Sequence, residues 1–484
     1  MGKKHNIIYI LTDQHRWDML GCAGHPTLKT PNIDRLAREG ISFTRAFTPT
    51  AICGPARASL YTGLVPTEHG VVGNSEGKEK VGIKEGVRGI NEYLTGYNSI
   101  LAGKWHVDDD KLPTTVGFTG HDFSGYAFPG SDVYQNFAFP QSPLKGNPYS
   151  EWLERKGFAI PTVSESVFGA KKTQEFYGKL SGPAEASIPH FIVDESKTLV
   201  NEATQNDEPF FLWMNFWGPH TPCVLPQPYF SMYNPEDIPE DPGFAETFEN
   251  KPIHQRFISH FWGVDAYDWS DWQQFIARYM GYITLIDDCI GDFFRYLEER
   301  GLYDDTVIVF TSDHGDAVGA HRLIEKGEFM YEETARIPFV VRHPDCQTPG
   351  TTSDAFVYFH DLCPTAAEIA TGEAPDLGQA ESILPLMLDN TATNDREYVY
   401  AQFTRHFMNL EHRMLRTRTH KLVFNASTIG ELYDLEKDPH ELTNQIDNPD
   451  YAEIKKDLFD KLCDEMEQIK DPLLSWVNSI RDIY

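Results

Sequence analysis

Four short apolar segments, each followed at once by polar or charged residues, constrain the fold of this chain more than any other feature. They are Ile7 to Leu11, Ser99 to Ala102, Phe210 to Phe216 and Val307 to Phe310. Segments that lack a polar and apolar alternation are typical of strands buried on both faces of a parallel sheet. In such a sheet, sites form beyond the carboxyl ends of the strands, and these segments carry polar residues at that end.

Helical patterns fall between these segments. Residues 30–40 combine an N-cap candidate, a proline in the first turn and a terminal glycine. Residues 194–205 and 271–300 are also expected to be helical, and the second of these carries apolar residues at roughly helical spacing. The alternation of strands and helices predicts an α/β fold, in which a large, mixed, mostly parallel sheet is sandwiched between helices.

The pattern changes after residue 385, where short strand-like segments precede an amphipathic helix. We therefore expect a catalytic domain over residues 1–385 and a smaller α+β subdomain over residues 386–484. The predicted elements of this subdomain are four antiparallel strands at 398–403, 413–416, 421–424 and 431–435, and a helix at 448–470.

The composition excludes several classes of protein. Lys and Arg number 42 against 72 Asp and Glu, and the resulting net charge of −30 argues against a nucleic-acid partner. No apolar run approaches the ~20 residues of a membrane-spanning helix, so we expect no membrane partner. The first apolar segment is shorter than the core of a signal peptide, so we expect a cytoplasmic protein, although a trimmed export signal would leave the same sequence. Seven cysteines without close spacing predict neither a disulfide framework nor a zinc site made of cysteine pairs.

The most specific segment of the chain is Cys53-Gly54-Pro55-Ala56-Arg57, which continues to Gly63. Proline fits the first turn of a helix, so Cys53 is expected at a helix N-terminus. Free N–H groups and the helix dipole favour negative charge there. Such a position lowers the pKa of a thiol or holds an anion.

This segment resembles the signature of the formylglycine-dependent sulfatases, members of the alkaline phosphatase-like superfamily, in which this cysteine is oxidised after translation to formylglycine. The resemblance covers essentially the whole chain. The other matching positions are Asp13, Gly103 to His106, Gly218 to His220, Ser312 to Gly315, Lys326, Leu432 to Leu435, Asp438, Pro439 and Glu441.

The resemblance implies a divalent metal held by Asp13, Asp313 and His314 and by an oxygen of the hydrated formylglycine made from Cys53. Hard oxygen ligands favour calcium or magnesium, and an imidazole nitrogen allows manganese or zinc; we expect calcium. Gln14 departs from the double carboxylate that is common at this point in the family, and relatives resembling phosphonate monoester hydrolases carry an amide here. Gln14 is either a weaker metal ligand or a contact to the substrate anion, and both roles stay open.

The resemblance also implies a mechanism, in which the hydrated formylglycine attacks sulfur in line, expels the alcohol and then releases sulfate as it returns to the aldehyde. The counterparts of Arg57 and His106 support the formylglycine. Those of Lys104, His220 and Lys326 contact the sulfate oxygens, and the His220 counterpart protonates the leaving group. Together these side chains would form a positive pocket on an acidic protein, which would draw in an anionic ester.

Five further residues lie close in sequence to the matching motifs and are candidates for the leaving-group side of the site, although turn or supporting roles are the favoured interpretation. They are His15, Arg16, Asn74, His321 and Arg322. His69 is expected to support the helix that carries Cys53. The aromatic residues Trp213, Phe216, Trp217, Trp262, Tyr267 and Trp269 are interpreted as core, with stacking on a sugar as the alternative. Residues 107–190 and 222–270 lack periodicity and are predicted to be long loops around the site.

The leading hypothesis is a sulfatase that hydrolyses a sulfate monoester, on a small sulfated sugar, after a formylglycine-generating or equivalent maturation enzyme has converted Cys53. Gln14 and His314 suggest an alternative, a phosphonate or phosphate ester hydrolase of the same superfamily; the pair Lys104 and His106 weighs against it. A glycan-binding pseudoenzyme would have lost a metal ligand or Cys53. A hydrolase that uses the Cys53 thiol directly would leave the carboxylates without a role.

Overall fold

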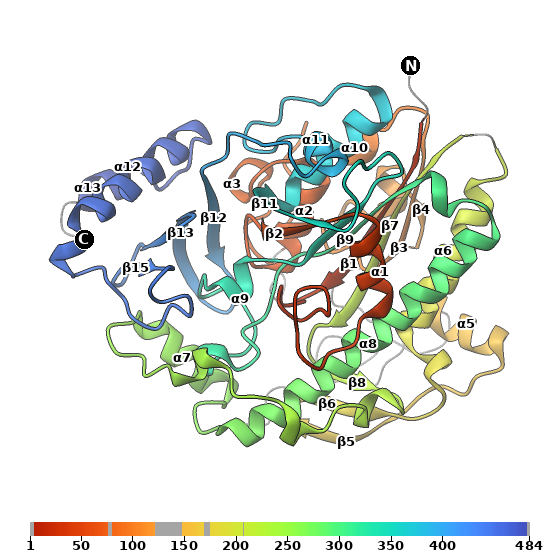
Figure 1. The fold of residues 1–484 in the computed structure, drawn as a ribbon, viewed down its shortest axis with the longest axis horizontal. Coiled ribbons are helices and arrows are strands. Elements are labelled where there is room, and N and C mark those ends of the chain that lie inside the picture. Colours follow the sequence, from red (N-terminus) through yellow and green to blue (C-terminus); the bar gives the residue numbers. More distant parts are fainter. Residues whose placement is uncertain (1–3, 76–79, 122–147, 169–174, 207, 482–484) are drawn as a thin grey trace.

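A computed structural model describes residues 4–75, 80–121, 148–168, 175–206 and 208–481, and its centre is an eight-stranded sheet in the order β11-β2-β10-β9-β1-β7-β3-β4 (Figure 1). Within the described residues of this sheet, β10 runs antiparallel to its neighbours and the other strands run parallel to one another. The strands are β1 (Asn6–Asp13), β2 (Ile41–Phe47), β3 (Asn98–Gly103), β4 (Thr119–Gly120), β7 (Phe210–Pro219), β9 (Thr306–Ser312), β10 (Phe339–Arg342) and β11 (Thr351–Tyr358). The prediction of a mixed, mostly parallel sheet is confirmed.

Helices cover both faces of this sheet. Successive residues of the central strands point to opposite sides, so each face presents apolar side chains that pack against a layer of helices. Ile8 and Ile10 of β1 pack in a core cluster with residues of α1 (Pro31–Glu39), α6 (Ile188–Ala203) and α8 (Trp269–Glu299). Tyr9 and Leu11 pack on the other face with residues of α2 (Cys53–Thr62) and α10 (Leu362–Thr371). The molecule is therefore a three-layer sandwich here. None of the described helices has the length and apolar composition needed to cross a membrane.

The C-terminal part forms a second sheet, at the left of Figure 1, in which four antiparallel strands follow one another in chain order. One face packs against the two last helices. The other face packs against Phe47, Ile52 and Met330, so the second sheet is joined to the first through a shared apolar cluster. The elements are β12 (Tyr398–Arg405), β13 (Asn409–Thr417), β14 (His420–Asn425), β15 (Glu431–Asp434), α12 (Ala452–Gln468) and α13 (Leu474–Ile480). This confirms the predicted subdomain of four strands and a helix; the predicted boundary at residue 385 falls inside α11 (Leu384–Leu388).

Residues 107–190 and 222–270 were predicted to be long loops, but they contain helices and strands, so that prediction is wrong in part. They hold a three-stranded sheet and two helices, and residues 122–147 and 169–174 of the first stretch lie outside the described residues. The elements are α5 (Pro148–Lys156), β5 (Val163–Phe168), β6 (Glu175–Leu180), β8 (Cys223–Leu225) and α7 (Ile253–Trp262). The short helices α3 (Pro66–His69) and α9 (Glu332–Ala335) complete the fold. Helix α6 begins six residues before its predicted start, because Pro189 is tolerated in its first turn.

Candidate active site

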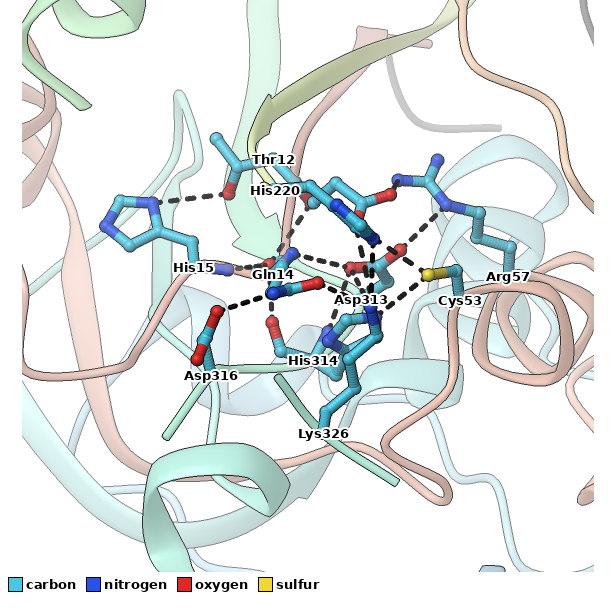
Figure 2. A network of polar contacts seen from close by, with 12 residues as sticks. Thr12, Gln14, His15, Cys53, Arg57, His220, Asp313, His314, Asp316 and Lys326 are labelled. Atoms are coloured by element: carbon cyan, nitrogen blue, oxygen red, sulfur yellow. Dashed lines mark hydrogen bonds and ion pairs between the residues drawn. The ribbon is translucent and has the colours of Figure 1, made fainter. Parts of the chain in front are cut away.

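The carboxyl ends of four strands bring the predicted site residues to one edge of the large sheet. Figure 2 shows several of these side chains, among them His220, Asp313 and His314. Asp13 ends β1, which pairs with β7 on one side and with β9 on the other. Asp313 and His314 follow β9, and His220 follows β7. Lys104 follows β3, which pairs with the far side of β7. The arrangement that the four apolar segments predicted is therefore present.

Asp13, Cys53, Asp313 and His314 form a buried cluster whose potential ligand atoms all lie within 4.8 Å of one another. The Cys53 Sγ atom lies 3.1 Å from His314 Nε2 and 3.7 Å from Asp13 Oδ1. His314 Nε2 lies 3.7 Å from Asp313 Oδ1 and 3.9 Å from Asp13 Oδ1. Two carboxylate oxygens, one imidazole nitrogen and the side chain at position 53 thus face a common point.

The orientation of His314 suits a metal ligand. Its Nδ1 lies 2.9 Å from the carbonyl oxygen of Gly315, to which it can only donate, so the neutral ring presents an unprotonated Nε2 to the two carboxylates. Burial lowers the pKa of His314, which favours this neutral ring. The donor set fits a divalent cation, because two carboxylates and a neutral imidazole gathered away from water would be stabilised by positive charge between them.

Arg57 and Lys104 hold the outer oxygens of the same carboxylates. Arg57 Nε donates to Asp313 Oδ2 at 2.8 Å, and its Nη2 donates to Asp13 Oδ2 at 3.2 Å. Lys104 Nζ also pairs with Asp13 Oδ2. Burial alone would raise the pKa of Asp13, but the charges of Lys104, His220 and Arg57 outweigh it and hold the pKa well below its ordinary value. Asp13 therefore stays ionised, with Oδ1 directed at Cys53 and His314.

The N-terminus of α2 sets the position of Cys53. Cys53 is the first residue of the helix, and the side chain before it offers no capping hydrogen bond. Asn74 Oδ1 accepts instead from the Gly54 N–H at 3.0 Å, and a Cβ at Gly54 would lie only 2.9 Å from that oxygen. His69 accepts from the Val71 N–H through Nδ1 and contacts Ser59 Oγ at 2.9 Å, so it supports α2 as predicted.

A second group of polar side chains surrounds Lys326, which is buried (Figure 2). The Nζ atom donates to Gln14 Oε1, to His220 Nε2 at 2.8 Å and to Glu325 Oε2 at 2.7 Å. His220 Nδ1 in turn donates to the Thr221 carbonyl oxygen at 2.7 Å, which leaves Nε2 as the acceptor. The ammonium group is thus surrounded by three acceptors.

Gln14 joins this second group to the metal-ligand cluster. Its Nε2 donates to Asp316 Oδ2, so its Oε1 faces Lys326. Its backbone N–H donates to Asp313 Oδ1 at 3.2 Å, and its φ of 64° lies in the left-handed region. These contacts place Gln14 between the metal-ligand cluster and Lys326.

His106 lies beside the N-terminus of α2, where its Cδ2 would be 3.8 Å from a Cβ at Gly54. Burial, with the charges of Lys104 and Arg57, lowers the pKa of His106 well below its ordinary value. The ring is therefore neutral at physiological pH.

The remaining predicted residues have other partners. His15 contacts the Met19 carbonyl oxygen at 2.8 Å, and Arg16 pairs with Asp241 at 2.8 Å. His321 lies 3.1 Å from Glu246 and stacks on Tyr331 at 3.5 Å between ring centroids. Arg322 donates to the Glu246 carbonyl oxygen at 3.1 Å. These contacts suit supporting roles, and substrate contact by these residues stays a prediction.

The aromatic residues predicted as core are placed there. Trp213, Phe216, Trp217 and Trp262 are buried in the core clusters, and Tyr267 and Trp269 pack against one of them.

Sequence reasoning missed Glu325, Thr221 and Asp316. Glu325 and Asp316 were adjacent, or nearly so, to the predicted residues Lys326 and His314. A carboxylate next to a predicted active-site lysine is a signal that could have identified Glu325 as a candidate.

Comparisons with known proteins agree with this geometry. The chain matches the sulfatase family over residues 5–372 and the C-terminal family of N-sulphoglucosamine sulphohydrolase over residues 319–468. It is 30% identical to the multifunctional alkaline phosphatase superfamily protein PehA of Trinickia caryophylli, with 95% of this chain and 94% of that protein covered. It is also 30% identical to an arylsulfatase of Clostridium perfringens, with 96% of this chain and 95% of that protein covered.

Solved structures share the fold. One is a protein in complex with its substrate D-glucosamine-2-N,6-O-disulfate, with a TM-score of 0.74 and 22% identity over 97% of this chain and 99% of that one. Another is the phosphonate monoester hydrolase of Agrobacterium radiobacter, with a TM-score of 0.76 and 24% identity over 96% of each chain.

Proposed function

The chain belongs to the sulfatase family, and from this we propose that it hydrolyses the sulfate monoester of a small sulfated sugar. We propose that the side chain at position 53 is the reacting group of the protein. One observation carries the proposal. Cys53 lies among Asp13, Asp313 and His314, and the cationic side chains Lys104 and Lys326 border the same cluster. A sulfuryl group needs both a polarised nucleophile and positive groups for its oxygens.

A divalent metal would be held by Asp13 Oδ1, Asp313 Oδ1 and His314 Nε2, with Gln14 Oε1 as a further candidate; we propose calcium, because most of these donors are hard oxygens. When bound, this cation supplies Lewis-acid charge at the reacting group. We further propose that a formylglycine-generating or equivalent maturation enzyme converts Cys53, which supplies an oxygen nucleophile in place of sulfur.

The protein's own residues would bind and orient the substrate. Lys104 and Lys326 would exchange part of their present contacts for sulfuryl oxygens, which lie where positive charge is concentrated. The Thr221 carbonyl oxygen fixes the His220 ring, so that Nε2 faces the Lys326 ammonium. Once Lys326 has turned to the sulfuryl group, His220 Nε2 could carry a proton and would be placed to donate it to the oxygen of the leaving alcohol. His106, whose ring is neutral, would accept a proton near position 53.

A phosphonate or phosphate ester hydrolase is the second candidate, and Gln14 together with the likeness to a phosphonate monoester hydrolase favours it. Lys104, paired with Asp13 beside Cys53, supports the sulfatase. A hydrolase that uses the thiol directly is disfavoured, because the imidazole 3.1 Å from Cys53 Sγ is His314, which also faces both carboxylates.

The test combines intact mass with sulfate release. Protein produced with a maturation enzyme is expected to be about 18 Da lighter at Cys53, as the CH2SH group becomes an aldehyde. It should release sulfate from a panel of sulfated mono- and disaccharides. Glucosamine sulfates come first in that panel, because the match to N-sulphoglucosamine sulphohydrolase favours them.

Cys53→Ala serves as the inactive control for this test. A strong preference for an aryl phosphonate over an aryl sulfate would overturn the sulfatase assignment. Full activity of the unconverted thiol would overturn the role of formylglycine.

A further inference from the structure

We propose that Glu325 is a specificity-determining residue of this site. Its carboxylate reduces the positive charge beside Lys326 and so selects singly charged sulfate esters against doubly charged phosphate monoesters. This inference rests on the proposed function, because it concerns the charge of the group that the same site would cleave.

The contacts of Glu325 hold its carboxylate against the Lys326 ammonium. Oε2 lies 2.7 Å from Lys326 Nζ, and Oε1 accepts from the Thr221 hydroxyl. The backbone N–H donates to Asp316 Oδ1 at 3.0 Å, and the residue has a left-handed φ of 71°. Only 3% of the residue is exposed, so bulk water screens this charge weakly. The negative charge is therefore a fixed part of the site.

The charges of the site show what Glu325 adds. Asp13 and Asp313 already offset Arg57 and Lys104 through direct pairing. Lys326 is the third cation, and its carboxylate partner is Glu325. Asp316, which accepts from Gln14 and from the Glu325 N–H, is a fourth carboxylate beside this group. With a divalent cation bound, the site still keeps a positive excess, and loss of the Glu325 charge would raise that excess by one unit.

The effect of this excess positive charge depends on the negative charge that a substrate carries. A sulfate monoester and a phosphonate monoester each carry one negative charge. A phosphate monoester carries two above its second pKa of about 6. A fixed carboxylate repels a dianion about twice as strongly as a monoanion at the same distance. Glu325 therefore disfavours phosphate monoesters, and it also favours release of inorganic sulfate, which is a dianion.

The test compares Glu325→Gln with the wild-type holoenzyme on three 4-nitrophenyl esters at pH 8: the sulfate, the phenylphosphonate and the phosphate. The amide has nearly the same shape as the carboxylate and keeps an oxygen for Lys326. We expect kcat/KM for the phosphate to rise about tenfold relative to the sulfate, a change of about 1.4 kcal/mol. The ratio for the phosphonate should stay unchanged, because its charge equals that of the sulfate. Inhibition by inorganic sulfate should become about tenfold tighter.

Glu328→Gln is the matched control, since this carboxylate is also buried and lies three residues after Glu325, where it accepts from the Phe407 N–H at 2.9 Å. The phosphate-to-sulfate ratio, the phosphonate-to-sulfate ratio and the inhibition by inorganic sulfate should all be those of the wild type in this variant. An unchanged phosphate-to-sulfate ratio in Glu325→Gln, or an equal change in Glu328→Gln, would overturn the inference.

Thermal unfolding checks that each variant is folded, and Glu325→Ser removes the same charge if Glu325→Gln does not fold. An inactive wild type would contradict the proposed function itself. An active wild type with an unchanged ratio in Glu325→Gln contradicts only the role of Glu325.

Discussion

Each of the two site carboxylates divides its oxygens between two kinds of partner. Oδ2 of Asp13 and Oδ2 of Asp313 both bind Arg57, while both Oδ1 atoms face His314. Arg57 has no exposed surface, and together with Lys104 its guanidinium compensates the charge of these two carboxylates in the metal-free protein. Removing it would leave two buried carboxylates with less compensation.

Arg57→Ala should therefore lower the free energy of unfolding of metal-free protein by about 3–5 kcal/mol. The proposed calcium ion should restore part of this loss, because it would add positive charge at the same carboxylates. Chemical denaturation with and without calcium measures both effects. Arg88→Ala is the control, since Arg88 is exposed and its ion pair with Glu92 spans 3.9 Å; an equal loss in this variant would contradict the explanation.

Glu333 offers a pH-dependent test at the same scale. Burial raises its pKa to about 8 from an ordinary value of 4.5, although Arg16 opposes the shift. Between these pH values the unfolded chain releases a proton that the folded chain keeps. The folded state therefore loses stability as the pH rises from 4.5 towards 8, by up to about 1.4 kcal/mol per unit.

Glu333→Gln removes this ionisation, so its melting temperature should rise relative to that of the wild type between pH 5 and pH 8. Glu85→Gln, at an exposed position, should show the same difference from the wild type at both pH values. A constant difference for Glu333→Gln would show that the carboxyl group is not held protonated.

At the scale of elements, the close approach of β3 and β7 places Lys104 in the site. Gly103 has a φ of +93°, and a Cβ there would lie 1.9 Å from the Asn215 carbonyl oxygen. The Lys104 N–H donates to that same oxygen at 3.1 Å. The glycine therefore allows the chain to turn at the end of β3 and to direct Lys104 at Asp13.

Gly103→Ala should lower the free energy of unfolding by about 2–4 kcal/mol. It should also reduce kcat by about a hundredfold, because Lys104 would move. Gly86→Ala is the matched control, since Gly86 has a φ of +83° with nothing within 4 Å of the added Cβ. That variant should lose only about 1 kcal/mol and keep full activity. Equal effects at both positions would mean that backbone conformation alone, and not the approach to β7, is responsible.

Among the strands of the large sheet, those that are buried along their whole length were the easiest to predict from sequence. β1 and β9 are buried on both faces, and their apolar residues revealed them. β11 was missed because its first half is partly exposed and carries Thr351 to Asp354, while only its second half is buried. β10 was missed because its four residues, Phe339 to Arg342, are too few to show a pattern.

In the site, too, some features could be predicted from local sequence patterns and others could not. Asp13, Asp313 and His314 follow strands and match motifs, so their meeting was predictable. The bond between Thr221 and Glu325 joins residues 104 positions apart, and no local pattern carries that information.

At the scale of the whole molecule, a buried ionic network joins the C-terminal sheet to the catalytic part. Lys421 of β14 lies 2.9 Å from Glu332 and 2.7 Å from Glu441. Arg416 of β13 lies 3.2 Å from the same Glu332, which stands six residues after Lys326. Removing the second sheet would take these partners from Glu332 and expose the apolar residues Phe47, Ile52 and Met330 that it covers.

A fragment of residues 1–385 is therefore expected not to fold, and the full chain should unfold in one transition by calorimetry. Limited proteolysis and circular dichroism of the fragment measure the first outcome. A soluble fragment with native far-ultraviolet signal, or two separate transitions in the full chain, would show that the two parts are independent domains.

The burial of Cys53 also bears on how an active molecule is made. Only 2% of this residue is exposed in the finished fold, beneath the ends of strands that meet only once the sheet has assembled. If the proposed maturation enzyme has to bind the peptide around Cys53, it would reach this residue only on a newly synthesised chain that has not yet folded. The fraction of working molecules would then be decided during synthesis, and treatment of purified protein would not increase it.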